Sequence, residues 1–290
     1  MKIAIIGSIN ADLMYTIEKE LVQGETIIGD TYHVMSGGKG ANQAVIANAL
    51  HNNVVFLGAR GDDAFGKNII SDLQEHKGLN TDAIITKSSN TGLAVIKVYN
   101  NDNSIVVFPG ANSELTTDDI DQFYNANPDI RYVVSQMEIA LDVVEYLLKE
   151  AHNRDIITIL NPAPAAKINQ SILENVDYII PNRLEANTLF NSQDYEQLVK
   201  THQGQLIITL GRDGVMIFHD SQVKTIPAKP IESVDTTGAG DAFVAGFTVG
   251  LARGYDIKQA AELGTEVAAI TCQYYGAQVG VDEINKQLSQ

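Results

Sequence analysis

The chain has 290 residues, 44% of them hydrophobic, and a formal net charge of −16 at pH 7. This length allows one large α/β domain or two smaller ones, and the apolar fraction excludes a disordered chain. The negative charge argues against nucleic acid and anionic membranes as partners. With no signal-peptide pattern, no run of roughly 18 apolar residues and a single cysteine, Cys272, we expect a cytoplasmic protein.

Strand-like and helix-like segments alternate along most of the chain. Short β-rich runs separated by helices indicate a mostly parallel sheet with helices on both faces, which is the α/β class. In chain order, the predicted strands are residues 2–7, 54–60, 132–136, 156–160, 177–181 and 206–210, and the predicted helices include 41–50, 63–76 and 140–152.

Two segments interrupt this alternation. Residues 13–35 carry strand-like pieces around Gly24, and residues 91–108 form two β-rich runs around an NNDN turn, which is a hairpin pattern. Together they predict a small antiparallel β-sheet that forms a lid on the main domain. We therefore assign residues 1–10, 36–88 and 112–290 to the main domain and residues 11–35 and 89–111 to the lid.

The DTTGAGD stretch at residues 235–241 places a glycine-rich turn at the start of an apolar helix pattern. The amides of Gly238, Ala239 and Gly240 would lie at the helix N-terminus, which favours an anion. Asp241 would repel a phosphate there, so the functional interpretation is a base that takes the proton of an attacking hydroxyl. The alternative is a tight turn with an acid that stabilises the helix dipole.

A second glycine-rich turn, GGKGANQA, occupies residues 37–44. It does not match the Walker-type phosphate loop. Lys39 and Asn42 instead offer a cation and an amide to polar groups such as sugar hydroxyls. The alternative is a helix-entry turn with an exposed lysine.

Polar residues follow two of the predicted strands. Asn10 and Asp12 come after the first strand, which lacks the GxGxxG of dinucleotide-binding folds, and Glu138 ends the run YVVSQME. Open α/β sheets bind ligands at the carboxyl ends of their strands, where these side chains could accept sugar hydroxyls. The alternatives are a polar turn and a solvated acid.

Two later motifs have a structural and a functional interpretation. Asn182 and Glu185 form a capping box in PNRLEA, or they hold Mg²⁺-phosphate through water. TLGRDG is a turn between strands, or it contacts a nucleotide phosphate through Thr209 and the Gly211 amide. Cys272 is interpreted as a buried small hydrophobe, and the six histidines lack metal-ligand spacing, which argues against zinc.

The order and combination of these motifs resemble the phosphofructokinase-B (PfkB) type carbohydrate kinases over nearly the whole chain. The GSINAD and GGKGANQA pair is similar to the members that phosphorylate ribose. The resemblance implies a fold with a β-sheet lid and ATP-dependent transfer of phosphate to O5 of D-ribose, with Mg²⁺ on the nucleotide. The motifs are GSINAD, QGET (23–26), GGKGANQA, GDD (61–63), PGAN (109–112), NPAPA (161–165), PN–E, TLG–G, DTTGAGD and YGAQ (275–278).

The resemblance also implies residue roles. Asp241 would be the catalytic base and the amides of Gly238, Ala239 and Gly240 the anion hole. The residues matched to the ribose site are Asn10, Ala11, Asp12, Gly38, Lys39, Gly40, Asn42, Glu138 and Asp241. Those matched to the ATP site are Asn182, Glu185, Thr209, Leu210, Gly211, Arg212, Asp213, Gly214, Gly240 and Thr265.

The family further implies an activating monovalent cation, K⁺ or a similar ion, and a homodimer through the lids. The cation would order the anion-hole loop and strengthen its field. Two alternatives stay open: a family kinase for 2-deoxyribose, another pentose or a nucleoside, and a regulator that binds sugar or nucleotide without catalysis. The intact Asp241 turn argues against the regulator. The positions matched to the cation site are Asp235, Thr237, Thr271, Tyr274, Gly276 and Gly280.

Overall fold

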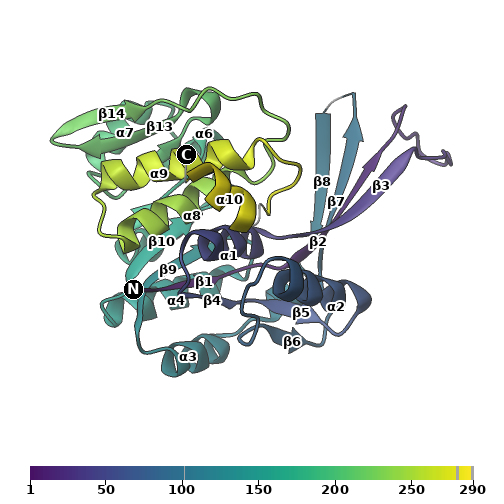
Figure 1. Ribbon diagram of the computed structural model, residues 1–290, viewed down its shortest axis with the longest axis horizontal. Coiled ribbons are helices and arrows are strands. Elements are labelled where there is room, and N and C mark those ends of the chain that lie inside the picture. The colour runs from purple at the N-terminus through teal and green to yellow at the C-terminus, as the bar shows by residue number, and fades with distance from the viewer. Residues whose placement is uncertain (101, 279–280, 289–290) are drawn as a thin grey trace.

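The core of the protein is a five-stranded parallel sheet with the strand order β11-β10-β9-β1-β4. The computed structural model describes residues 1–100, 102–278 and 281–288 (Figure 1). The prediction of an α/β fold with a mostly parallel central sheet is therefore confirmed. The strands of this sheet are β1 (Lys2–Ile6), β4 (Val54–Leu57), β9 (Ile130–Gln136), β10 (Ile157–Asn161) and β11 (Tyr178–Ile179).

Successive side chains of β1 point to opposite faces of the sheet, and each face is covered by its own hydrophobic cluster. Ile3 and Ile5 pack into one hydrophobic cluster, and Ala4 and Ile6 pack into the other. Both faces of a parallel strand are covered by helices, which is why KIAII is apolar without alternation. Helices α1, α8, α9 and α10 contribute to the first cluster, whereas α3 and α4 contribute to the second (Figure 1).

The three predicted helices are present at the predicted places, as α1, α2 with η1, and α4. The expected helix at 63–76 begins at Ala64, because Asp63 is its N-cap, and its second half is a π-helical segment, η1 (Asp72–His76). The helices are α1 (Lys39–Leu50), α2 (Ala64–Ser71), α3 (Thr117–Ala126), α4 (Leu141–Asn153), α5 (Gln170–Glu174), α6 (Arg183–Phe190), α7 (Tyr195–Thr201), α8 (Ala239–Ala252), α9 (Ile257–Thr271) and α10 (Val281–Leu288), with short 3-10 helices η2 (Gly110–Glu114) and η3 (Gly211–Asp213).

Three predicted strands are shorter than expected. The run 54–60 is divided at Gly58 into β4 and β5 (Ala59–Gly61), and β5 pairs with β6 (Ile85–Lys87). The run 177–181 is paired as a strand only at Tyr178–Ile179. The run 206–210 contributes β12 (Ile208–Thr209), which joins β13 (Val215–His219) and β14 (Gln222–Ile226) in an antiparallel sheet. Apart from Asp177, the other residues of the last two runs are buried, and some still bond to neighbouring strands: Ile179 forms a parallel bridge with Leu206, and Ile180 N donates to Leu160 O.

A second sheet projects from the main body with the order β3-β2-β7-β8 (Figure 1). The predicted hairpin is confirmed as β7 (Gly92–Tyr99) and β8 (Asp102–Phe108), and β2 (Asn10–Thr16) pairs antiparallel with β3 (Thr31–Gly37). The two pairs join through a parallel pairing of β2 with β7, so the sheet is mixed. Two separate segments of the chain form it, and we call it the lid sheet.

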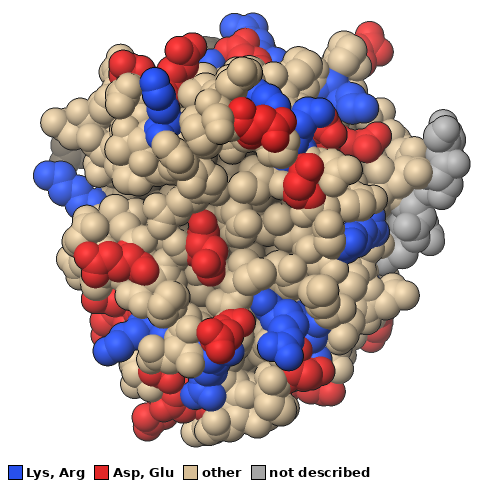
Figure 2. Space-filling model, turned by 90° about the vertical axis from the view of Figure 1, so that its left-hand side faces the viewer, with Lys and Arg blue, Asp and Glu red and all other residues tan. Residues whose placement is uncertain are grey.

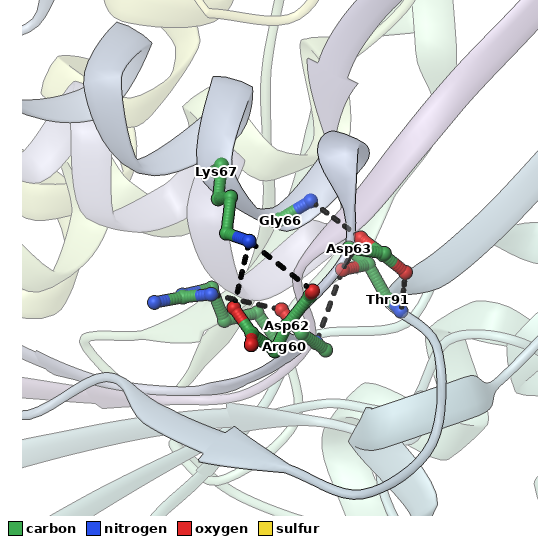
Figure 3. A network of polar contacts seen from close by, with 7 residues as sticks. Arg60, Asp62, Asp63, Gly66, Lys67 and Thr91 are labelled. Carbon is green, nitrogen blue, oxygen red and sulfur yellow. Dashed lines mark hydrogen bonds and ion pairs between the residues drawn. The ribbon is translucent and has the colours of Figure 1, made fainter.

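Asp63 anchors the lid sheet to the main body (Figure 3). Its Oδ1 accepts hydrogen bonds from Gly66 N (2.8 Å) at the start of α2 and from Thr91 Oγ1 (2.7 Å), and its Oδ2 accepts one from Thr91 N (2.7 Å). Thr91 directly precedes β7. Burial raises the pKa of Asp63, but these hydrogen bonds outweigh it and leave the pKa below its usual range.

Charged side chains are distributed rather than gathered on the face shown in Figure 2, where acidic and basic groups alternate between broad uncharged areas. Within the described residues, no helix is long and apolar enough to cross a membrane.

Candidate active site

A cavity of about 190 Å³ lies where α1, α6 and α8 approach the ends of β10, β11 and β12. It brings together the predicted anion-hole turn, the predicted base, the Lys39 motif and part of the predicted ATP set. The lining residues are Lys39, Asn161, Ala163, Ile180, Asn182, Glu185, Thr209, Thr236, Gly238, Ala239, Gly240, Asp241 and Val244.

The anion-hole turn is the N-terminus of α8. Gly238 is the N-cap and has a φ of 77°, a left-handed conformation that favours glycine. A Cβ at this position would also lie 2.4 Å from Ala277 Cβ. The following amides of Ala239 and Gly240 belong to the first turn of α8, where the helix dipole favours negative charge.

Asp241 is buried at the base of this turn, and both of its carboxylate oxygens are held by amides from α1. Asn42 Nδ2 donates to Oδ2 (2.9 Å), and Gln43 Nε2 donates to Oδ1 (2.9 Å). The orientation of the carboxylate is therefore fixed by side chains that come from a segment nearly 200 residues earlier. Asn42 was expected to be a sugar ligand, whereas no role was expected for Gln43, although it is part of the GGKGANQA motif.

Lys39 is the cation of the site. Its pKa is raised mainly by the charge of Asp241, then lowered by burial, and raised further by Glu138, Glu185 and Asp12. The charges of four carboxylates thus act on one lysine, so acidic groups outnumber basic groups around it. A phosphorylated ligand would need additional cations to bind here.

Asp12 on β2 is partly buried near Lys39, and its carboxylate accepts no hydrogen bond from another described residue. Desolvation, followed by the charges of Glu138 and Asp241, raises its pKa to about 7, and Lys39 opposes that shift. The Asp12 carboxyl therefore changes its charge near neutral pH. Ala11, its neighbour in sequence, lines a different cavity of about 540 Å³ between the lid sheet and α2.

Asn10 and Glu138 are each positioned by a residue that sequence analysis missed. Asn112 donates from Nδ2 to Asn10 Oδ1 (2.8 Å) and accepts from Ile9 N (2.9 Å). Ser8 Oγ donates to Glu138 Oε2 (2.5 Å), which also accepts from Lys39 N (3.1 Å). Asn112 and Ser8 both lie in motifs already quoted, PGAN and GSINAD.

The predicted capping box of α6 is confirmed. Asn182 Oδ1 accepts from Glu185 N (2.9 Å), and Glu185 Oε2 accepts from Asn182 N (2.7 Å). Desolvation raises the pKa of Glu185, opposed by the Asn182 amide and by Lys39, while Asp241 raises it further. Both residues also line the cavity, so capping leaves them beside the anion-hole turn.

Of the remaining ATP candidates, Thr209 lines the cavity, and Leu210 and Asp213 do not. Both are held by Arg183, which was not among the predicted residues: it donates to Leu210 O (2.7 Å) and forms an ion pair with Asp213 (2.6 Å). Arg212 and Gly211 are exposed in η3, and Gly214 ends it. Thr265 is buried in α9, donates to Ala261 O and does not line the cavity, so its adenine contact stays a prediction.

Five of the six cation candidates lie around one loop contact. Asp235 Oδ1 accepts from Thr237 N (2.9 Å), and Asp235 Oδ2 accepts from Gly276 N (3.0 Å). Burial raises the pKa of Asp235, but the hydrogen bonds outweigh it and lower the pKa overall. Thr271 O accepts from Tyr274 N (3.1 Å) in the same turn. Gly280 lies outside the described residues.

Cys272 is buried beside this loop, as predicted, and burial raises the pKa of its thiol. Its carbonyl accepts hydrogen bonds from Val234 N (2.8 Å) and Asp235 N (3.2 Å). Within the described part of the chain, no group of three or more His, Cys, Asp or Glu side chains could hold a metal ion by itself.

The family model described as pfkB family carbohydrate kinase matches residues 1–284. The chain belongs to this family. Among curated relatives of this carbohydrate kinase, the ribokinase of Lactococcus lactis is 36% identical over 287 residues, which cover 98% of this chain and 95% of that protein. The ribokinase of Bacillus subtilis is 37% identical over 286 residues, 98% of this chain and 97% of that protein.

The fold comparison agrees with the family. The structure of Arabidopsis thaliana ribokinase complexed with ribose and ATP has a TM-score of 0.88 to this carbohydrate kinase at 27% identity, and the match covers 100% of this chain and 99% of that one.

The donor set of this kinase fits Mg²⁺ only together with a nucleotide. Mg²⁺ in kinases is bound through one or two carboxylates, water and the substrate phosphates rather than by an all-protein cage. Glu185 and Asp241 line the cavity and are the carboxylates placed for such contacts. The positions matched to a monovalent cation lie apart from these two carboxylates, around the contact of Gly276 N with Asp235 Oδ2, and their role stays a prediction.

Proposed function

We propose that this carbohydrate kinase transfers the γ-phosphoryl group of ATP to O5 of D-ribose, giving D-ribose 5-phosphate and ADP. The observation that carries the proposal is the position of Asp241. It is buried at the N-terminus of α8, directly after the glycine turn and next to Lys39. A carboxylate repels phosphate and would not help to bind it. It can, however, accept a proton from the attacking hydroxyl, and this is the role that we assign to Asp241.

Asp241 would accept the proton of the ribose 5-hydroxyl while O5 attacks the γ-phosphorus. The new O5–P bond forms as the bond from the γ-phosphorus to the β,γ-bridging oxygen breaks, and the electron pair leaves with ADP. The amides at the start of α8 would stabilise the negative charge of the transferring group, although Ala239 N donates to Thr236 O (3.2 Å) in this structure. Asn42 and Gln43 hold the carboxylate so that its position is set before the substrate arrives.

The sugar side of the proposal rests on Asn10, Asp12, Lys39 and Glu138. Their carboxylates can accept hydrogen bonds from vicinal hydroxyls, and Lys39 can donate. The relatives whose sequences match over nearly the whole chain carry the name ribokinase. A 2-deoxyribose, another pentose or a nucleoside remains the alternative substrate, and a regulator without catalysis is the third hypothesis.

Mg²⁺ bound with ATP would neutralise phosphate charge in a site that contains more carboxylates than cations. K⁺, or a similar monovalent ion, is the proposed activator at the Asp235 loop. When bound, it would order the turn that precedes the anion hole and add positive field to it.

We also propose that the lid sheet forms a homodimer interface. Ile105, Val106, Val107 and Phe108 on β8 are each roughly half exposed, and Tyr32 on β3 is 72% exposed. Four adjacent apolar residues at a sheet edge are costly in a monomer. Equilibrium sedimentation of the wild type and of Val106→Glu tests this: we expect a dimer for the first and a weaker one for the second. A wild-type monomer at micromolar concentration would overturn it.

The function is tested by ADP release from purified protein with Mg-ATP and a panel of acceptors. The panel contains D-ribose, 2-deoxyribose, other pentoses, fructose 6-phosphate and nucleosides, each with and without K⁺. We expect the highest kcat/KM with D-ribose and an increase with K⁺. Faster turnover of another acceptor would keep the mechanism and change the substrate. Ribose binding without turnover of any acceptor would favour the regulator.

A further inference from the structure

Each oxygen of Asp241 is the end of a chain of two side-chain amides. On one side, Gln278 Nε2 donates to Asn42 Oδ1 (3.1 Å), and Asn42 Nδ2 donates to Asp241 Oδ2 (2.9 Å). On the other, Gln136 Nε2 donates to Gln43 Oε1 (2.6 Å), and Gln43 Nε2 donates to Asp241 Oδ1 (2.9 Å). We call these the Gln278 arm and the Gln136 arm.

In both arms every amide NH₂ group donates toward Asp241, and in both the oxygen of the outer glutamine has no hydrogen-bond partner among the described residues. Gln278 Oε1 and Gln136 Oε1 are buried, and neither accepts a hydrogen bond from another described residue. Leaving a buried acceptor unpaired is costly. Rotating either outer amide would place its oxygen against the oxygen of the inner amide. The orientation of the outer glutamine is therefore determined by the inner amide, which must present NH₂ to Asp241.

The Gln136 arm is built into the core. Gln136 ends β9, and both Gln136 and Gln43 are fully buried. A Cβ on Gly7 would lie 1.9 Å from Gln136 Oε1, so the glycine after β1 leaves the space that this side chain occupies. Gln43 Nε2 also reaches Asn161 Oδ1 (3.3 Å), which restrains its rotation further.

The Gln278 arm connects Asp241 to the loop that carries the cation candidates. Gln278 follows Gly276 by two residues, and Gly276 N donates to Asp235 Oδ2. The carbonyl of Gln278 accepts from Lys77 Nζ (3.0 Å), which fixes the end of that loop against η1. An ordered loop therefore holds Gln278 where its amide meets Asn42.

We propose that Gln278 and Gln136 are positioning residues that orient Asn42 and Gln43, so that Asp241 always meets two amide donors and never an amide oxygen. In addition, the Gln278 arm makes the orientation of Asp241 depend on whether the loop at residues 271–278 is ordered. This inference rests on the proposed role of Asp241 in phosphoryl transfer, because that role gives the orientation its consequence. The hydrogen-bond pattern itself can be measured without turnover.

The first test is NMR of the side-chain amides in the full-length protein without substrate. We expect Gln278→Met to move the Asn42 NH₂ resonances and leave those of Gln43, and Gln136→Met to do the reverse. Gln205→Met is the matched control, since Gln205 donates to two carbonyls, Leu173 O and Val176 O, away from the site. The two-arm arrangement would be overturned if either variant shifted the NH₂ resonances of both Asn42 and Gln43, or if it shifted neither.

The second test is kinetic and uses the polarity of the Gln278 arm. Gln278→Met should lower kcat roughly tenfold, the value of one lost hydrogen bond of about 1.4 kcal/mol, with a smaller change in the KM for ATP. Gln278→Glu should be worse than Met at pH 8. Its carboxylate would accept from Asn42, turning the Asn42 oxygen toward Asp241. A role in packing alone predicts the opposite order, because glutamate keeps the shape of glutamine.

A double-mutant comparison separates the inference from the proposed function. In an Asp241→Ala background, Gln278→Met should not lower the residual rate further, because the arm acts through the carboxylate. A further tenfold loss there would overturn the positioning role. If the wild type phosphorylates no acceptor, the proposed function fails, and the NMR result alone still decides whether the two arms exist.

Discussion

Two carboxylates of the candidate site, Asp241 and Asp12, are close enough for their charges to interact, and their surroundings differ. Asp241 on α8 receives one amide donor on each oxygen, and those donors are themselves held. Asp12 on the lid sheet receives no hydrogen bond from a described residue, and burial with two nearby carboxylates raises its pKa to about 7. In the main domain, the carboxylate of Asp241 already has its hydrogen-bond donors. In the lid sheet, the carboxylate of Asp12 has none among the described residues.

This difference is what a kinase with a lid requires. A base must already be in place when the hydroxyl attacks, so its orientation is built into the fold. A substrate-binding carboxylate obtains its partners from the substrate hydroxyls, and its unfavourable state without them is relieved on binding. The largest effects should therefore come from changing Asp241, and intermediate effects from changing Asp12.

Asp241→Asn should reduce kcat by about 10³-fold, within the range of general-base catalysis. The amide cannot accept the proton, and its NH₂ would oppose the donor of either Asn42 or Gln43. Asp241→Ala, which removes the acceptors without introducing a donor, is the companion variant and should lose as much. Initial rates of ADP release measure both, and turnover of both variants near the wild-type rate would contradict the base assignment.

Asp12→Asn should weaken D-ribose binding about 10- to 100-fold while leaving ATP affinity unchanged, because hydrogen bonds to a charged acceptor are lost. Calorimetric titration with each ligand separates the two. Val34→Ala, on the same sheet but lining the cavity next to α2, is the control. A parallel loss of ATP affinity would place Asp12 at the nucleotide instead.

Ribose affinity should also depend on pH through Asp12. The ionised carboxyl accepts two hydroxyls, so affinity should rise as pH increases through about 7 and fall by up to about tenfold per pH unit below it. Titrations between pH 5.5 and 8.5 measure the profile. Asp12→Asn should remove this dependence, and an unchanged profile in that variant would assign it to another group.

The free protein should show the opposite sign in its stability. Because the folded pKa of Asp12 lies above the unfolded value of 3.8, the folded state binds the proton more tightly between about pH 4 and 7. This carboxyl therefore stabilises the fold less as pH rises through that window. Urea unfolding at pH 5 and pH 8 should show a smaller decrease for Asp12→Asn than for the wild type, and equal decreases would exclude this contribution.

The smallest expected effect concerns the anchor of the lid sheet. Asp63→Ala removes the cap of α2 and the contacts to Thr91, which should cost about 1 kcal/mol of stability and raise the KM for ribose a few-fold. Asp62→Ala is the control, because Asp62 forms only an exposed pair with Lys67 (Figure 3). Equal effects of the two substitutions on KM would show that the anchor does not position the lid.

The sequence was sufficient for the features that depend on local pattern. Apolar runs separated by amphipathic helices predicted the parallel sheet, and the NNDN turn predicted the β7–β8 hairpin. Pairing direction could not be predicted from local pattern: in the lid sheet, β2 pairs in parallel with β7, which no turn signal encodes. The lengths of β11 and β12 were also missed, because burial produces the same apolar runs as strand pairing.

In the site, Asp241, Lys39 and the glycine turn were found together with Asn10, Asn42 and Asn182, but the buried amides of Gln43 and Gln136 were not. Asp241, Lys39 and Gly238 have side chains or a backbone whose chemistry suggests a role in isolation. Gln136 obtains its role only by donating to Gln43, and Gln43 only by donating to Asp241, which lies nearly 200 residues later in the sequence. A single sequence does not show that such distant amides meet.

The most direct test of the account is the D-ribose dissociation constant of Asp241→Asn, measured by calorimetry beside its turnover. If Asp241 acts as the base on a site that is otherwise complete, the variant should bind ribose nearly as tightly as the wild type while turnover falls about 10³-fold. A loss of ribose affinity as large as the loss of rate would mean that Asp241 holds the sugar rather than taking its proton.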